Sequence, residues 1–316
     1  MHDRGQESRG ALAQEEAGSA VGSLKGILAM VAATALFTCG DTAMKLVSTS
    51  LPTGEAVFVR SAFTVATITV AAFWTGAIYA LREAFVRPMG WRCAGDVGSA
   101  LFFQAALARM PFADLMGILQ MTPLSLTAAS AAFLGERVGW RRWSAVGVGF
   151  IGALLVIKPG TSAFNIWALV GVLAVLSGAV RDIATRKLDV ALSPLLILLL
   201  AQIGVCLTGL GLSALEPWKA PTWGELFALF FASSFSLMGQ LCLIYSLRSG
   251  EIGAVAPFRY AGMVWAILLG FLIWNQLPDA LSLTGIAILA SAGIYTFYRE
   301  QKLGRSRTAS TARPAA

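Results

Sequence analysis

Long apolar runs separated by short polar stretches recur along the whole chain. A helix that crosses the hydrocarbon core of a bilayer needs about 20 mostly apolar residues. Ten runs approach this length, which predicts an all-α integral membrane protein with ten transmembrane helices. The runs cover residues 24–47, 54–75, 93–108, 114–134, 143–157, 166–184, 193–212, 226–247, 253–274 and 280–298.

The stretch from Ala105 to Gly160 is matched by a second stretch about 140 positions later, and such a fixed-period match indicates one structural unit used twice. Leu107 matches Leu247, and Gly152-Ala153 match Ala292-Gly293. We therefore expect a first repeat of five helices and a second repeat of five. The expected segments are a disordered cytoplasmic tail at 1–23, the first repeat at 24–158, a linker at 159–165, the second repeat at 166–298 and a basic cytoplasmic tail at 299–316.

The basic residues predict the orientation. With the N-terminus inside, most of the 24 lysines and arginines fall in the cytoplasmic loops and tails. Such a bias is typical of the cytoplasmic side of membrane proteins, so both termini are expected to be cytoplasmic. Only three basic residues fall on the outer side, Arg109, Lys158 and Lys219, and four lie at membrane depth, Lys45, Arg60, Arg181 and Arg259.

Five helices per repeat make the two halves inverted with respect to each other. Inverted repeats are typical of secondary transporters, whose substrate binds near the membrane midplane between the halves. The topology thus predicts a class of protein and no particular cargo.

The composition agrees with a membrane protein and argues against other classes. The chain is 57% hydrophobic and 13% charged, and a soluble domain carries about twice that charge. The net charge of +7 forms no aromatic-interleaved patch, so nucleic-acid binding is not expected. The only histidine is His2, and the four cysteines lack metal spacing. No cofactor, metal site or catalytic residue is therefore predicted.

Two other classes stay open as alternatives. Asp41 and Asp96 each follow a glycine in apolar surroundings, a pattern that faintly resembles intramembrane aspartyl proteases. Neither carries the full motif, and an inverted repeat has no role in that chemistry, so an enzyme is not expected. A channel or a receptor is the second alternative, and accumulation of a substrate against its gradient would distinguish a coupled carrier from a channel.

Charged residues inside the predicted spans are candidates for coupling or gating, because a charge at membrane depth needs a partner or a water-filled cavity. Asp41 and Lys45 in the first run match Asp182 and Arg186 in the sixth. The i, i+4 spacing places each acid and base on one helix face. Two interpretations explain this pattern. Each acid and base forms a local ion pair, or the charged residues exchange ion-pair partners, or one aspartate takes up a proton, during transport. Arg60 in the second run is expected to pair with Asp41 or Glu55.

Polar and aromatic groups in the later runs are candidate substrate-binding residues. Arg259, Tyr260 and Trp265 offer a fixed positive charge beside aromatic faces, which suits an anionic or aromatic ligand. Interhelical packing and hydrogen bonding are the alternative for the uncharged groups. Pro123 is expected to free a carbonyl and kink the fourth helix. The further candidates are Gln104, Gln120, Gln240 and Tyr245.

The chain resembles the EamA-type members of the drug/metabolite transporter superfamily between Leu24 and Tyr298. The resemblance rests on the sequence Thr-Pro-Leu-Ser-Leu-Thr from Thr122, on Phe-Leu-Gly-Glu-Arg from Phe133, and on the positions of the last basic residue of the first helix and of Arg60. The chain departs from the family in the first helix, and at Asn275, where the second repeat lacks the Leu-Gly-Glu sequence. The resemblance implies alternating access around a central cavity formed by helices 1, 3, 4, 6, 8 and 9.

We therefore expect a multi-pass secondary transporter of the bacterial cytoplasmic (inner) membrane, whose partners are a small-molecule substrate and the lipid bilayer. Riboflavin or another aromatic or anionic metabolite is the first candidate substrate, because Arg259 lies beside Tyr260. Export of amino acids or related metabolites is the alternative. The sequence leaves open the direction of transport, the coupling and a homodimer.

Overall fold

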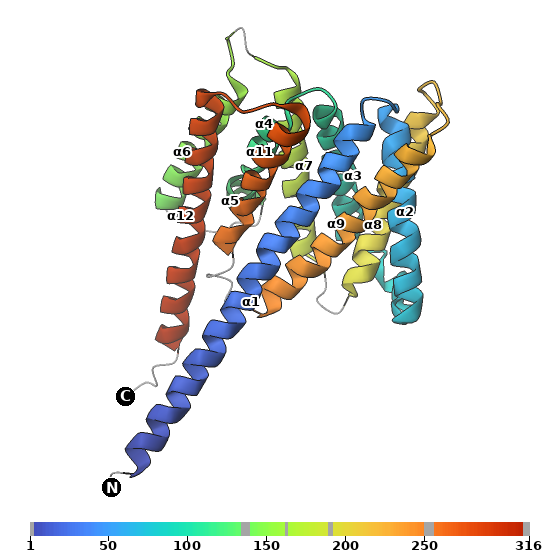
Figure 1. Ribbon diagram of the computed structural model, residues 1–316. Coiled ribbons are helices and arrows are strands. Elements are labelled where there is room, and N and C mark those ends of the chain that lie inside the picture. Colours follow the sequence, from blue (N-terminus) through green and yellow to red (C-terminus); the bar gives the residue numbers. More distant parts are fainter. Residues whose placement is uncertain (1–2, 134–139, 162–163, 189–191, 250–255, 312–316) are drawn as a thin grey trace.

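The computed structural model describes the backbone of residues 3–133, 140–161, 164–188, 192–249 and 256–311. Side chains are described within these ranges except at 3–23, 141–142, 186, 247–249, 256–257, 297 and 299–311. The regular elements of these ranges are all helical (Figure 1). They are α1 (Asp3–Val47), α2 (Thr53–Trp74), η1 (Ala77–Ala84), α3 (Arg87–Leu107), α4 (Phe112–Leu119), α5 (Thr122–Phe133), α6 (Trp140–Ile157), α7 (Trp167–Arg186), α8 (Pro194–Ser213), α9 (Trp223–Ser249), η2 (Ala256–Tyr260), α11 (Ala261–Trp274) and α12 (Ala280–Thr311).

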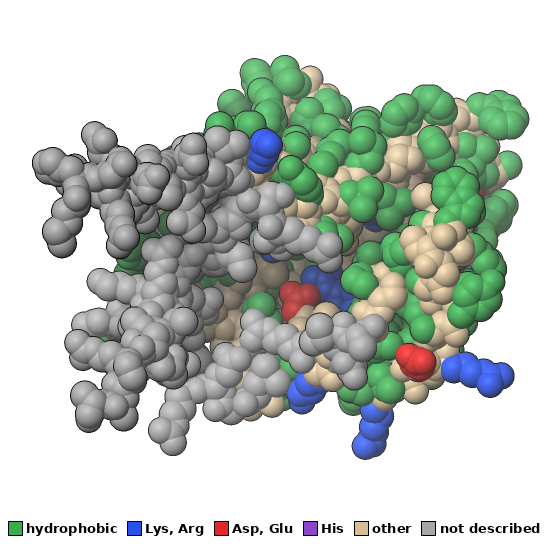
Figure 2. All heavy atoms as spheres, turned by 90° about the horizontal axis from the view of Figure 1, so that it is seen from below, with side chains coloured by type: hydrophobic (Ala, Val, Ile, Leu, Met, Phe, Trp, Pro, Cys, Tyr) green, Lys and Arg blue, Asp and Glu red, His purple; other side chains and the backbone are tan. Residues whose placement is uncertain are grey.

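Among the described residues, six helical segments are long and apolar enough to cross a membrane, namely Leu24–Val47, Thr53–Trp74, Phe112–Phe133, Trp167–Thr185, Pro194–Ser213 and Trp223–Ser246. Three shorter apolar segments are Trp143–Ile157, Phe258–Trp274 and Ala280–Thr296. The helix α3 is in neither set and carries Arg92 and Asp96. Large apolar side chains cover much of the outer surface (Figure 2), as expected for contact with lipid.

Two predicted helices are broken in the structure. The fourth run, expected at 114–134, forms α4 and α5 with a turn at Gln120 and Met121. The ninth run, expected at 253–274, forms the 3₁₀ helix η2 and then α11, and residues 250–255 lie outside the described part. Both interruptions follow from local sequence, because a proline lies at or next to each and proline cannot donate a backbone hydrogen bond.

The first helix differs from the expectation at its start. The first predicted run begins at residue 24, and the backbone of α1 is helical from Asp3 onward. Alanine, glutamate, glutamine and arginine are common in this stretch, and all four are good helix formers. The sequence pattern lacks apolar periodicity there, and backbone propensity extends the helix without it.

The helix packing has an internal symmetry. Helix α1 of the first half packs on α9 of the second half, and α3 of the first half packs on α7 of the second. The helix α2 packs on α8, α6 on α12, and α4 on α11. If α1, α2, α3, α4 and α6 are exchanged with α7, α8, α9, α11 and α12, the pairs α1–α9 and α3–α7 interchange, and each of the other three pairs maps onto itself. Figure 1 shows α1 and α9 side by side along their length.

Glycines allow two of these pairs to approach closely. A Cβ atom on Gly95 of α3 would lie 2.6 Å from the backbone nitrogen of Arg181 and 2.8 Å from the carbonyl oxygen of Ser177 in α7. A Cβ atom on Gly152 of α6 would lie 2.8 Å from the carbonyl oxygen of Gly285 in α12. Larger side chains at these positions would push the helices apart, so the small residues determine how tightly the two halves pack.

We predict that Gly95→Ala lowers the stability of the folded protein by about 1–3 kcal/mol, the usual cost of overpacking a fitted interior. The matched control is Gly90→Ala in the same helix, where a Cβ atom meets nothing within 4 Å. Thermal unfolding of the purified protein in detergent measures both. Equal melting temperatures for the two variants would contradict the close approach of α3 and α7.

Candidate functional site

A cavity of about 330 Å³ lies inside the bundle, within the range of about 300–1,000 Å³ common for small-molecule sites. Its walls come from α1, α3, α4, α5 and the α4–α5 turn in the first half, and from α7, η2 and α11 in the second. The resemblance also implied the eighth helix. Among the described residues, α9 supplies no part of the wall, because it packs behind α1 through Gly40 and Gly239.

One face of α1 forms a polar wall of the cavity. Thr34, Phe37, Thr38 and Asp41 follow at i, i+3, i+4 and i+7, so they lie on one side of the helix, and all four line the cavity. The two threonine hydroxyls donate to carbonyls of their own helix, over 2.9 Å for Thr34 and 2.8 Å for Thr38. Their oxygens therefore remain acceptors for a ligand, beside the carboxylate of Asp41.

The break between α4 and α5 faces the cavity and is closed by a side chain. Pro123 has no N–H to bond the carbonyl of Leu119, four residues earlier. The hydroxyl of Thr122 donates to that carbonyl instead, over 2.6 Å. Leu119, Gln120, Thr122 and Pro123 all line the cavity, which confirms the expected kink. The break thus brings main-chain and side-chain polar groups to the cavity wall.

The second break supplies the positive charge. Arg259 and Tyr260 end η2 and line the cavity, as does Gly262 at the start of α11. The side chain of Arg259 is exposed rather than packed, and it interacts electrostatically with Asp182. A charge in this position is available to an anionic group of a ligand.

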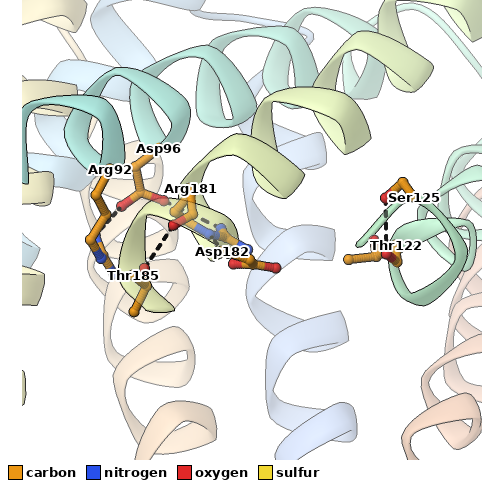
Figure 3. Close-up of polar contacts among 7 residues, drawn as sticks. All are labelled: Arg92, Asp96, Thr122, Ser125, Arg181, Asp182 and Thr185. Carbon is orange, nitrogen blue, oxygen red and sulfur yellow. Dashed lines mark hydrogen bonds and ion pairs between the residues drawn. The ribbon is translucent and has the colours of Figure 1, made fainter. Parts of the chain in front are cut away.

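A chain of ion pairs holds a second arginine at the cavity. Arg181 of α7 donates to Asp182 over 2.8 Å and to Asp96 of α3 over 3.3 Å. Asp96 also lies 3.5 Å from Arg92, one turn earlier in α3. Figure 3 shows Arg181 between the two carboxylates, with Arg92 beyond Asp96. This network joins α3 to α7 and fixes the guanidinium of Arg181 at the wall.

Other contacts replace the expected i, i+4 ion pair of Asp41 with Lys45, and the expected pair of Asp182 with Arg186 stays a prediction. Asp41 lines the cavity, whereas Lys45 lies one turn beyond it and donates to the carbonyl of Met110 over 2.5 Å. Asp182 pairs with Arg181, and the side chain of Arg186 lies outside the described part. In each case the helix surroundings select the partner, since a neighbouring helix end or an adjacent residue offers better geometry.

Arg60 also finds a partner that differs from the expected carboxylates. Its guanidinium donates to the hydroxyl of Ser236 over 2.9 Å and so joins α2 to α9. Asp41 is near enough to interact with it electrostatically. Glu55 instead accepts the backbone N–H of Lys219 over 3.1 Å, in the first turn of α2.

Of the candidate substrate-binding residues, the structure brings Arg259, Tyr260 and Gln120 to the cavity, and it places four others elsewhere. Gln104 is 1% exposed within the core, Trp265 is partly buried, and Tyr245 is 53% exposed on the outer surface. Gln240 lies on α9, behind the cavity wall. These polar groups look alike in sequence, and only the packing of neighbouring helices separates them.

Sequence reasoning missed several wall residues. Arg181, Ser99 and Phe103 line the cavity but were not candidates. Arg181 carried a usable signal, because an arginine at membrane depth needs a nearby acid and Asp182 follows it directly. Ser99 and Phe103 are separated by one helical turn in α3 and carry no distinguishing signal.

The end of the bundle away from the termini is closed by contacts around Trp274. Lys45, one turn beyond Asp41, lies 5.3 Å above the ring of Trp274, and the ring of Phe112 lies 5.7 Å from the same ring. At this end Lys158 donates to Asp279 over 2.7 Å. Seen from the opposite end, Figure 2 shows acidic and basic side chains together in a hollow of that face.

Among the described residues no group of three or more histidine, cysteine, aspartate or glutamate side chains is placed to hold a metal ion. What the arrangement offers is one carboxylate, two guanidinium groups, hydroxyl groups and aromatic rings around a small-molecule cavity. Broken helices at a polar cavity in an apolar bundle are the geometry of membrane transport proteins.

Comparison with known families agrees with this geometry. The model of the EamA-like transporter family matches residues 24–158 and again residues 165–299. The chain belongs to this family and carries its domain twice. The family and these relatives are transporters and not enzymes, and the apolar helices of this chain indicate a multi-pass membrane protein.

The chain is similar to several characterised proteins. It is 31% identical over 180 residues to the S-adenosylmethionine uptake transporter of Rickettsia bellii, covering 57% of this chain and 62% of the relative, which is less than two thirds of that protein. It is 29% identical over 273 residues to the pseudopaline exporter CntI of Pseudomonas aeruginosa, covering 85% and 94%. It is 27% identical over 218 residues to the riboflavin transporter of Vibrio cholerae, covering 67% and 71%.

A solved crystal structure shares the fold. The two chains superpose with a TM-score of 0.63 at 17% sequence identity, over 88% of this chain and 98% of the other. At this identity the likeness concerns the fold alone.

We predict a small acid-dependent stability from the closed end. The hydrogen bond from Lys158 lowers the pKa of Asp279 below its ordinary value. Because the folded pKa lies below the unfolded one, the pair stabilises the fold above about pH 4 and loses this effect as pH falls through the folded pKa. Asp279→Asn should lower stability at neutral pH by less than about 1 kcal/mol, since the pair is partly exposed.

Thermal unfolding in detergent between about pH 3 and about pH 7 measures this effect. Asparagine keeps the cap that Asp279 provides to the backbone N–H of Ser282, so the variant isolates the ion pair. Lys158→Gln should remove the same part of the acid dependence. An unchanged acid dependence in both variants would contradict the assignment.

Proposed function

We propose that the protein is a secondary transporter that moves a small zwitterionic metabolite across the bacterial cytoplasmic membrane by alternating access. It has ten transmembrane helices in two inverted halves, residues 24–158 and 166–298, joined by the linker 159–165. Two observations support this architecture. The family model matches twice, and the helix pairs exchange with one another when the halves are exchanged.

Both termini are cytoplasmic in this proposal. The basic residues of the loops support it, and the two termini lie at the same end of the bundle (Figure 1). The contacts around Trp274 then close the outer end, and the charged hollow of Figure 2 faces the cytoplasm.

The single observation that carries the substrate class is the presence of opposite charges on opposite halves of one cavity. Asp41 belongs to the first half and Arg259 to the second, and both line the cavity. A ligand with an ammonium or sulfonium group and a carboxylate satisfies both. Aromatic side chains of the wall, Phe37, Phe103 and Tyr260, suit a flat ring in the same ligand.

S-Adenosylmethionine has all of these groups, namely a sulfonium, an α-amino acid and an adenine ring, and a relative of the chain is named for its uptake. We therefore propose it as the first candidate. Riboflavin is the second, because relatives are named for it and the aromatic wall favours a flat ring system. Riboflavin carries no permanent charge, however, so it offers no charged group to Asp41 or Arg259. Amino acids share the zwitterion but lack the adenine ring.

Alternating access follows from the positions of these groups. A substrate that touches α1 and η2 contacts both halves, so it is held during closure of the inner end. Opening of the outer end requires the contacts of Trp274 with Lys45 and Phe112 to separate. Asp41 at the cavity and Lys45 at the outer end both lie on α1, and Arg259 and Trp274 both lie in the ninth predicted helix, so the two regions are directly connected.

We predict saturable uptake of radiolabelled S-adenosylmethionine into proteoliposomes. Arg259→Gln and Asp41→Asn should each raise KM by about tenfold to a hundredfold, because each removes a charge-assisted hydrogen bond worth about 1.5–3 kcal/mol. The control is Arg82→Gln, which changes an exposed arginine of η1. If the protein takes up riboflavin but no S-adenosylmethionine, and Asp41→Asn does not change riboflavin uptake, the proposed substrate is wrong and the proposed transport activity stands.

We also predict the orientation. Green fluorescent protein fused to either terminus should fluoresce in the cytoplasm, and alkaline phosphatase fused after Trp218, between α8 and α9, should be active outside. Phosphatase activity from a fusion at the C-terminus would contradict both the inverted arrangement and the even number of spans. Membrane insertion of each fusion is checked by fractionation.

A further inference from the structure

Tyr260 forms part of the cavity wall at the junction of η2 and α11. Its hydroxyl group is buried, and no described group forms a hydrogen bond with it. A buried hydroxyl usually has a partner, so polar contacts do not explain the position of this ring. The position is therefore set by the shape of the surface against which the ring packs.

That surface is α12 at Gly293. A Cβ atom added to Gly293 would collide with the hydroxyl oxygen of Tyr260, and it would lie 2.7 Å from Cζ and 3.5 Å from Cε1 of the ring. Gly293 itself is buried, and it has no positive φ angle. The backbone conformation therefore accepts any residue, and glycine is needed only because the phenol occupies the place of a side chain.

The internal repeat supports this interpretation. The position of the first half that matches Gly293 is Ala153, which is buried in α6. The equivalent helix in the other half thus holds a Cβ atom without difficulty. The requirement for glycine belongs to the second half, where an aromatic side chain reaches the last helix.

We propose that Gly293 determines the size of substrate that the cavity accepts, by leaving a notch in α12 that keeps the ring of Tyr260 out of the cavity. The proposal rests on the proposed function, since it concerns the specificity of the same site. With a Cβ atom at position 293 the ring must move, and the cavity is the open space on its other side. Bulky ligands then lose access while small ligands keep it. Gly293 acts through Tyr260 and is a positioning residue.

The first test measures the width of the cavity without any transported substrate. Ser99 lines the cavity, and Ser99→Cys is nearly isosteric. The native cysteines Cys39, Cys93, Cys206 and Cys242 are replaced by alanine, so that the introduced thiol is the only one. Its labelling rates are then compared for small methanethiosulfonate ethylammonium and for bulky fluorescein maleimide. Gly293→Ala should slow the bulky reagent by about tenfold, the usual effect of one methylene too many in a fitted site, and leave the small reagent unchanged.

Three further variants distinguish the effect of the notch from a general loss of structure. Gly147→Ala is the matched control, because a Cβ atom on this glycine of α6 meets nothing within 4 Å. Tyr260→Phe combined with Gly293→Ala removes the colliding oxygen and should restore part of the bulky labelling, with Cζ still in close contact. Tyr260→Leu in the chain with Gly293 should speed bulky labelling, which tests the proposal even if Gly293→Ala does not fold.

The second test uses transport. Gly293→Ala should raise KM for S-adenosylmethionine more than for methionine, a smaller zwitterion, with partial recovery in the double variant. Equal labelling rates in Gly293→Ala and the parent chain, or equal slowing of both reagents, would overturn the proposal. If Gly293→Ala slows labelling by the bulky reagent but the protein transports neither compound, the role of Gly293 is supported and the proposed substrate class is wrong.

Discussion

A charged side chain inside an apolar bundle must have a polar partner or a polar cavity, and this constraint organises the structure. Arg60 reaches Ser236 on another helix, Lys45 reaches a carbonyl at the end of α3, and Arg181 reaches Asp96. Each contact therefore joins two helices. Because desolvated charges are costly when unpaired, these contacts limit which helices can be neighbours around the cavity.

The same constraint applies to the backbone at the break of the fourth helix. Pro123 leaves the carbonyl of Leu119 without its helical donor, and the hydroxyl of Thr122 replaces the missing N–H. The carbonyl at the break thus has a hydrogen-bond donor within the chain. It also turns the neighbouring groups, Gln120 among them, toward the cavity. The same break therefore interrupts the helix and supplies polar groups to the cavity.

Much of the fold could be predicted from the sequence because apolar runs and prolines are local signals. Most of the described helices coincide with the predicted runs, and the kink at Pro123 is confirmed. Ion-pair partners could not be predicted in this way. The i, i+4 rule considers one helix, whereas Arg181 is held between its neighbour Asp182 and Asp96 of another helix. Gln104 and Gln120 are alike in sequence, and only tertiary packing buries one and exposes the other to the cavity.

The packing of the halves is symmetric, but the chemistry of the cavity is not. The guanidinium groups, Arg181 and Arg259, come from the second half, and the carboxylate of Asp41 comes from the first. In the proposed cycle, closing the empty cavity would bury Arg259 and Asp41 with less water and no new partner, which is unfavourable. A zwitterion between them supplies both partners. The charge arrangement therefore favours movement of the loaded carrier over the empty one.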